Sequence, residues 1–101
     1  MEAAYSKQRV PIRLSAKRWA HIVEHHDDVA GYRDTVLEAI EEPEHIVRGK
    51  ASELLALKSI GDRTLVVVYR ETSRTDGFVI TAFFTSEPDR ITKRGVIWPK
   101  H

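Results

Sequence analysis

Apolar and polar positions follow two different periods along the chain, and the change falls near Pro43. Before Pro43, apolar residues recur every three or four positions, which is the spacing of a helix that packs one side on a core. This spacing predicts a helix over residues 16–26, with Ser15 as its N-cap, and a second helix over residues 32–41. Proline lacks a backbone N–H, so Pro43 should end the second helix. Residues 1–10 are mostly polar, and we expect them to be only loosely attached.

Downstream of Pro43 the pattern is that of β-strands joined by short turns. Strands are predicted over residues 45–48, 53–60, 64–70 and 78–85, and residues 95–98 are a candidate for a further edge strand. Residues 65–69 are apolar on both faces, as expected of a central strand. In the last long strand, alternation should place Phe78, Ile80, Ala82 and Phe84 on one face and Val79, Thr81, Phe83 and Thr85 on the other.

These elements predict a single α+β domain over residues 1–101. A chain of 101 residues is long enough for one domain with a substantial core. Short connections favour antiparallel pairing of successive strands. The expected fold class is two N-terminal helices packed on one face of an antiparallel sheet of about four strands.

Charge is balanced overall but unevenly distributed. The formal net charge is only +1, so no global field attracts nucleic acid. Residues 5–19 hold five basic side chains and no acid, residues 24–44 hold eight acids against one arginine, and residues 90–100 are basic again. Two basic segments that lie together would form an anion-binding face, whereas solvated termini would give the same pattern. Both interpretations stay open.

Cysteine usage and hydropathy limit the remaining classes. The chain has no cysteine, which excludes disulfides and thiolate metal sites. It has no signal-like apolar run at its start and no stretch near the ~20 apolar residues of a membrane span. We therefore expect a cytoplasmic protein that does not engage a membrane.

His21 and His25 are the strongest candidates for catalysis. They lie four residues apart on the first predicted helix, so both imidazoles project from one side, together with Arg18. Two histidines can supply one base and one acid, as cleavage of RNA through its own 2′-hydroxyl requires. Groups that could neutralise the phosphate are the cations Arg48, Lys58 and Arg70 and the hydroxyls of Tyr69, Thr81 and Thr85. Solvated surface histidines are the alternative explanation of the pair.

The same stretch, His21-Ile22-Val23-Glu24-His25, matches the H-x-x-E-H pattern of inverted zinc metalloproteases. In that pattern the histidines bind zinc and the glutamate is the general base. Such enzymes also need a third protein ligand and a substrate groove, for which a chain of 101 residues leaves little room. A zinc hydrolase is therefore the less favoured interpretation.

The order of motifs resembles a known superfamily. A basic helix with His21 and His25 is followed by Val36-Leu37-Glu38-Ala39-Ile40-Glu41-Glu42-Pro43, a short strand, Leu65-Val66-Val67-Val68-Tyr69 and Val79-Ile80-Thr81-Ala82-Phe83. This order, over residues 14–98, resembles the phage-associated nucleases of the barnase–EndoU–colicin–RelE-like superfamily and is similar to BrnT-type toxins. The resemblance implies a helix-on-sheet fold and metal-independent RNA cleavage by residues of the first helix and the adjoining sheet face. It implies His21, His25 and Thr81 as catalytic residues and Arg48 or Lys58 as the phosphate-binding cation.

The function expected from the sequence is that of a small metal-independent endoribonuclease, as the toxin component of a toxin–antitoxin or phage-related system. No cofactor and no metal are expected; the partners are RNA and an antitoxin or another protein, and monomer and homodimer both stay open. The expected RNA-binding residues are Arg18, Arg48, Lys58, Tyr69, Arg70 and Thr85. The alternatives are a non-enzymatic protein- or RNA-binding module of the same fold and the zinc hydrolase.

Overall fold

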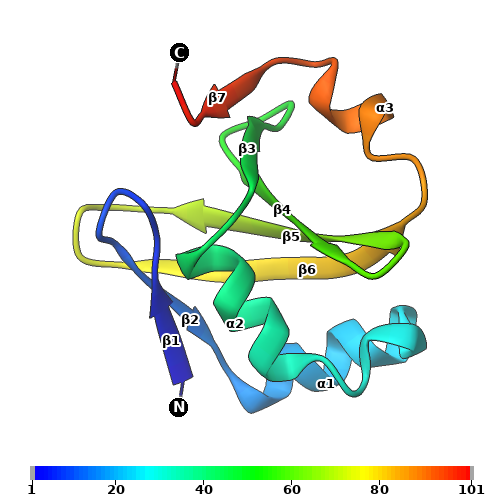
Figure 1. The fold of residues 1–101 in the computed structure, drawn as a ribbon. Coiled ribbons are helices and arrows are strands. Elements are labelled where there is room, and N and C mark those ends of the chain that lie inside the picture. Colours follow the sequence, from blue (N-terminus) through cyan, green and yellow to red (C-terminus); the bar gives the residue numbers. More distant parts are fainter. Residues whose placement is uncertain (1, 101) are drawn as a thin grey trace.

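The computed structural model of the chain describes residues 2–100, and a mixed seven-stranded sheet forms its centre (Figure 1). The strand order across the sheet is β1-β2-β6-β5-β4-β3-β7. The strands are β1 (Glu2–Tyr5), β2 (Pro11–Leu14), β3 (His45–Arg48), β4 (Leu54–Ile60), β5 (Arg63–Glu71), β6 (Gly77–Thr85) and β7 (Val96–Trp98). The helices are α1 (Ala16–His25), the single 3₁₀ turn η1 (Asp27–Val29), α2 (Arg33–Glu41) and the short α3 (Asp89–Thr92).

The expected fold class was wrong, because the helices do not begin the fold and the sheet is neither four-stranded nor wholly antiparallel. A hairpin of β1 and β2 precedes α1, and β2 runs parallel to β6, with Ile12 opposite Gly77. Residues 1–10 were expected to be loosely attached, but residues 2–10 supply β1, in which Ala4 is buried, and the turn after it, in which Ser6 is buried. Both strands were missed because residues 2–14 alternate polar and charged residues with few apolar ones, which gives no clear hydrophobic period.

The elements predicted between residues 16 and 98 are present, each to within one residue at both ends. The Ser15 hydroxyl accepts a hydrogen bond from the Arg18 N–H at 3.0 Å, so Ser15 caps α1 as expected. The His26 N–H donates to the Ile22 carbonyl where α1 ends. The short α3 was not predicted, since four residues span little more than one helical turn.

The two faces of the sheet are covered unequally. On one face, the buried residues Ile22 of α1 and Ile40 of α2 share an apolar core with Val67 of β5. On the other face, which we call the α3 face, a smaller cluster around Val66 is joined by Ile91 of α3. Leu65, Val66 and Val67 are all fully buried, so the prediction that this strand is central and apolar on both faces is confirmed.

An irregularity in β6 changes which of its side chains share a face. Val68 pairs with Thr81, but Tyr69 pairs with Val79, so Ile80 is an extra residue between two ladder pairs. Residues directly opposite in an antiparallel pair lie on the same face. Phe78, opposite Arg70, therefore lies on the α3 face with Thr81 and Phe83. The expected alternation was wrong for the first part of this strand, because it assumed a regular β6.

The ends of the described chain lie at opposite edges of the sheet, β1 at one and β7 at the other (Figure 1). The two basic segments meet at one point, where the Lys7 ammonium lies 5.0 Å from the centre of the Trp98 ring. None of the helices within residues 2–100 has the length and apolar character needed to cross a membrane.

Candidate functional site

A hollow of about 290 Å³ lies between α1 and the edge of β6, and we call it the α1–β6 hollow. It is lined by Arg18, His21, Ile22, His25, His26, Ile80 and Thr81. The two histidines and the threonine that the sequence suggested for catalysis therefore lie around one space, together with the arginine of the same helix. Three of the seven lining side chains are imidazoles, which concentrates groups able to exchange protons at this place.

The hollow exists because β2 covers only the first part of β6. The parallel pairing ends at Phe78, and the chain then leaves the sheet at Ser15 to form α1. From Ile80 onward the edge of β6 faces α1 instead of a strand, and an Arg18 guanidinium N–H points at the Ile80 carbonyl at 3.5 Å. The helix therefore lies beside an open strand edge.

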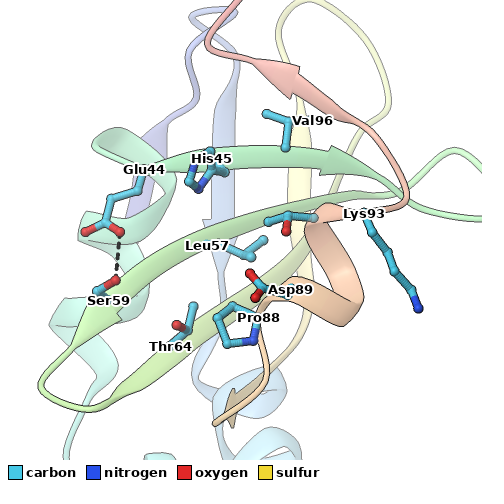
Figure 2. A pocket seen from close by; sticks show the side chains of 10 residues that line it. Glu44, His45, Leu57, Ser59, Thr64, Pro88, Asp89, Lys93 and Val96 are labelled. Atoms are coloured by element: carbon cyan, nitrogen blue, oxygen red, sulfur yellow. Dashed lines mark hydrogen bonds between the residues drawn. The ribbon is translucent and has the colours of Figure 1, made fainter.

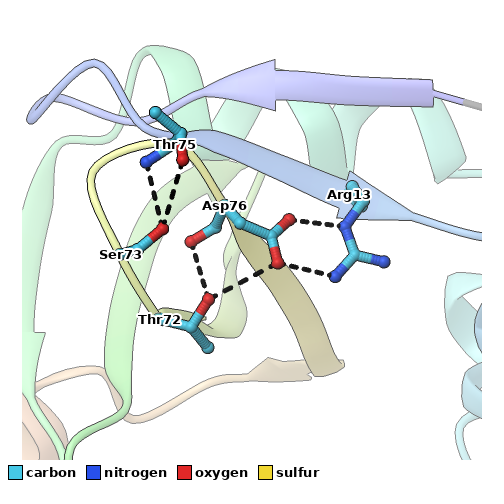
Figure 3. A network of polar contacts seen from close by, with 5 residues as sticks. All are labelled: Arg13, Thr72, Ser73, Thr75 and Asp76. Atoms are coloured by element: carbon cyan, nitrogen blue, oxygen red, sulfur yellow. Dashed lines mark hydrogen bonds and ion pairs between the residues drawn. The ribbon is translucent and has the colours of Figure 1, made fainter.

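The junction of β2 with the start of β6 is fixed by a polar network (Figure 3). The Arg13 guanidinium donates two hydrogen bonds to the Asp76 carboxylate, Nε at 2.8 Å and one terminal nitrogen at 3.1 Å. The Thr72 hydroxyl donates to the Asp76 carbonyl at 2.9 Å. This bidentate pair lowers the pKa of Asp76 and ties the β5–β6 loop to β2, which leads directly into α1.

The irregularity in β6 lies at the hollow. In a regular strand Ile80 and Thr81 would point to opposite faces. With Ile80 as the extra residue, both of them line the hollow beside His21 and His25. Bulges are common next to functional sites. Here Thr81 keeps its pairing with Val68, and the change of register falls on Ile80 and the residues before it.

The two histidines have a defined relative geometry. Their ring centres are 4.4 Å apart and the ring planes are inclined by 47°. His25 Nδ1 lies 3.0 Å from the His21 carbonyl oxygen, which can only accept, so Nδ1 carries the proton in this bond. The lone pair of His25 is then on Nε2, the nitrogen free to act as a base or a ligand. Both side chains are exposed.

A second hollow of about 490 Å³ adjoins the first, because Arg18 and His21 line both. Its other lining residues are Ser15 and Lys17. Two cations with a hydroxyl and an imidazole suit a phosphate group. Lys17 was not singled out in the sequence, although it lies four residues before His21 and so shares its side of the helix.

His26 is a further histidine of the site. It is the residue that ends α1, half-buried, with its ring 5.9 Å from that of Phe83. Because it lies just beyond the regular helix, helical spacing could not place it with His21 and His25.

Several expected phosphate-binding residues lie elsewhere. Arg48 is on β3 and Lys58 on β4, whereas β6 is separated from β4 by β5. The Lys58 ammonium donates to the Glu42 carbonyl at 3.1 Å, beside the end of α2. Neither lines either hollow, so the structure leaves Arg18 and Lys17 as the cations of the site.

Tyr69 is a core residue. It is 1% exposed, and burial raises the pKa of its phenol far above the usual value. Thr85 lies four residues beyond Thr81, about 13 Å along a strand at ~3.3 Å per residue. Its hydroxyl accepts from the Glu87 N–H at 3.0 Å. The structure does not bring these two residues to the histidines.

Arg70 lies on the α3 face, opposite Phe78. Its Nε is buried and has no hydrogen-bond partner within residues 2–100. A buried, unpaired guanidinium donor is uncommon. Phe78 and Phe83 are half-buried on the same face, so an arginine and two rings flank Thr81 on this side of the sheet.

A larger cavity lies elsewhere, between α3 and the strands β3, β4 and β5, with a volume of about 610 Å³ (Figure 2). Its lining residues are Glu44, His45, Leu57, Ser59, Thr64, Pro88, Asp89, Thr92, Lys93 and Val96. In the figure, the Glu44 carboxylate accepts from the Ser59 hydroxyl at 2.8 Å, and Lys93 extends away from the other side chains. With one imidazole and charges of both signs, it offers no pair of imidazoles beside an arginine.

The chain matches no known family model, no curated protein and no solved structure. Its function has to be inferred from the residues of the site.

Proposed function

We propose that the protein is a small metal-independent endoribonuclease whose active site is the α1–β6 hollow. The observation that carries the proposal is the grouping of His21, His25, Thr81 and Arg18 around one space. An acid, a base, a hydroxyl donor and a cation are the groups that cleavage through the 2′-hydroxyl requires.

In this mechanism His25 Nε2 takes the proton of the RNA 2′-hydroxyl, because Nδ1 already donates to the His21 carbonyl. The 2′-oxygen attacks phosphorus, and the bond from phosphorus to the 5′-oxygen breaks. His21 gives a proton to that 5′-oxygen, so the products are a 2′,3′-cyclic phosphate and a free 5′-hydroxyl.

The negative charge that develops on the phosphorane needs donors on its non-bridging oxygens. Arg18 and the Thr81 hydroxyl take this role, and Lys17 holds the next phosphate in the adjoining hollow. His21 and His25 are separated by four residues, about 6 Å along a helix axis at 1.5 Å per residue. The reacting RNA backbone therefore runs roughly parallel to α1.

The test is cleavage of a mixed RNA pool by the purified protein with EDTA present. Wild type should cleave, and His21→Ala should lose cleavage by about 100-fold or more, as expected for a general acid. His45→Ala is the matched control, an exposed histidine on β3 that should cleave like wild type. Equal cleavage by His21→Ala and wild type would refute the assignment. A toxin role in the cytoplasm, with a protein antitoxin, rests on the superfamily resemblance and extends this proposal.

A second candidate is RNA binding without cleavage, and it is favoured by the α3 face beside Thr81. Aromatic rings on a sheet face stack on unpaired bases, and an arginine can pair with the phosphates between them. Phe78, Phe83 and Arg70 supply both kinds of group there. RNA binding that Phe83→Ala weakens and His21→Ala leaves intact, with no cleavage by wild type, would favour this candidate.

A further inference from the structure

His21, Glu24 and His25 lie on one turn of α1, and each offers a ligand atom within 4.8 Å of the other two. We propose that these three side chains form a site for a first-row transition metal, with Zn²⁺ as the preferred ion, and that the bound metal inhibits RNA cleavage. The inhibitory half of this proposal rests on the proposed function, whereas the metal site stands without it.

The donor set is the first argument. Two imidazole nitrogens and a carboxylate oxygen are ligands that Zn²⁺ accepts, with bonds of about 2.0–2.2 Å. Around a tetrahedral ion with such bonds two ligand atoms lie about 3.4 Å apart, so the side chains must close by roughly 1–1.5 Å. All three side chains are exposed, and Glu24 makes no ion pair within residues 2–100. They can therefore turn toward a shared ion without disturbing the core.

The orientation of His25 is the second argument. Histidines that bind metals usually donate their other ring N–H to a carbonyl or carboxylate, which fixes the tautomer and the ring. His25 Nδ1 makes such a bond to the His21 carbonyl at 3.0 Å, and this leaves the lone pair of Nε2 free to bind a metal.

This site differs from that of a zinc hydrolase, which needs a further protein ligand beyond the H-x-x-E-H stretch. Within residues 2–100, one cluster of three His, Asp or Glu side chains has this spacing, and all its members come from one helix. Water completes the coordination, and the ion stays at the surface. The metal occupies the lone pair that His25 needs as a base and replaces the proton that His21 needs as an acid, so it blocks the metal-independent reaction.

The first experiment is calorimetric titration of Zn²⁺ into EDTA-free protein. Wild type should bind one ion, and His21→Ala and His25→Ala should lose saturable binding. Glu24→Gln should weaken binding by about tenfold, because one of three ligands loses its charge. His45→Ala is the control and should bind as wild type does. Absence of one-to-one binding, or binding unchanged in both histidine variants, would overturn the site.

The second experiment is RNA cleavage across a range of Zn²⁺ concentrations. Zinc should abolish cleavage by wild type and EDTA should restore it. Glu24 has no part in the cleavage step, so Glu24→Gln should cleave like wild type without zinc and need about tenfold more zinc for inhibition. Undiminished cleavage at saturating zinc would overturn the inhibition. Zinc binding by a protein that never cleaves RNA would refute the proposed function and leave the metal site standing.

Discussion

Thr81 of β6 and His21 of α1 line the same hollow, although they lie in different halves of the chain. Two features of the backbone coincide at this hollow. The pairing of β2 with β6 ends at Phe78, which leaves the next part of β6 open to α1. The irregularity at Ile80 lies in this open part of β6, directly before Thr81. The site thus depends on a strand edge as much as on a helix face.

Thr81→Val should lower RNA cleavage by about 100-fold, since loss of one donor to a developing oxyanion typically costs 10²–10³ in kcat. Valine has nearly the same shape as threonine, so the strand should be preserved. Thr85→Val is the matched control, because Thr85 lies on the same face away from the histidines. Single-turnover rates on one RNA substrate measure the difference. An equal loss in both variants would point to damage to β6 instead of a lost donor.

Arg18→Gln should weaken RNA binding and reduce its salt dependence, because Arg18 lines both hollows and would neutralise a phosphate. The slope of log K against log salt should fall by about one unit for one lost phosphate contact. Arg48→Gln, on β3, should leave the slope unchanged. Fluorescence anisotropy with a labelled RNA at several salt concentrations provides the measurement. A larger effect from Arg48→Gln would contradict this site and indicate that RNA binds near β3, toward the other edge of the sheet.

Gly77→Ala should destabilise the protein by about 1–3 kcal/mol, as overpacking of a tight core position does. A Cβ at Gly77 would lie 2.5 Å from the Arg70 carbonyl oxygen and 2.6 Å from Ile12 Cδ1. Ile12 belongs to β2, whose pairing with β6 leads into α1, and Arg70 belongs to the neighbouring strand β5. Gly31→Ala is the control, since a Cβ there has no neighbour within 4 Å. Urea unfolding followed by circular dichroism measures both variants, and equal stability of the two would contradict this explanation.

The local part of this fold can be read from the sequence, and the non-local part cannot. Helical spacing and the Ser15 cap predict α1 because they depend on neighbouring residues. The parallel pairing of β2 with β6 joins residues 65 positions apart in the chain through two ladder pairs, Ile12 with Gly77 and Arg13 with Phe78. No hydrophobic period encodes such a contact, so the fold class was missed with it.

In the candidate site, too, the local grouping of residues could be predicted from the sequence and the non-local grouping could not. His21, His25 and Arg18 share one helix, so their spacing alone groups them. The choice of phosphate cation depends on strand order, and Arg48 and Lys58 lie on strands beyond β5 from the hollow. Tyr69 lies in a strand buried on both faces, so its hydroxyl was a poor candidate once the strand was known to be central.

Asp76→Asn should destabilise the protein at neutral pH, and this difference should vanish in acid. The hydrogen bonds from Arg13 hold the pKa of the folded-state carboxyl below its ordinary 3.8. A carboxyl whose pKa is lowered by folding stabilises the protein above its unfolded-state pKa and loses that effect as the pH falls through the folded-state value. The stabilising effect is therefore complete above about pH 4 to 5 and is lost below 3.8.

The measurement is the urea midpoint of wild type and variant, compared at neutral pH and at a pH below the ordinary pKa of aspartate. Asp62→Asn, in the exposed β4–β5 turn, should show no such pH-dependent difference. Arg13→Gln should reproduce the effect of Asp76→Asn, because the two side chains act as one bidentate pair. A difference between wild type and Asp76→Asn that persists unchanged in acid would mean that Asp76 acts through the shape of the loop, with its charge playing no part.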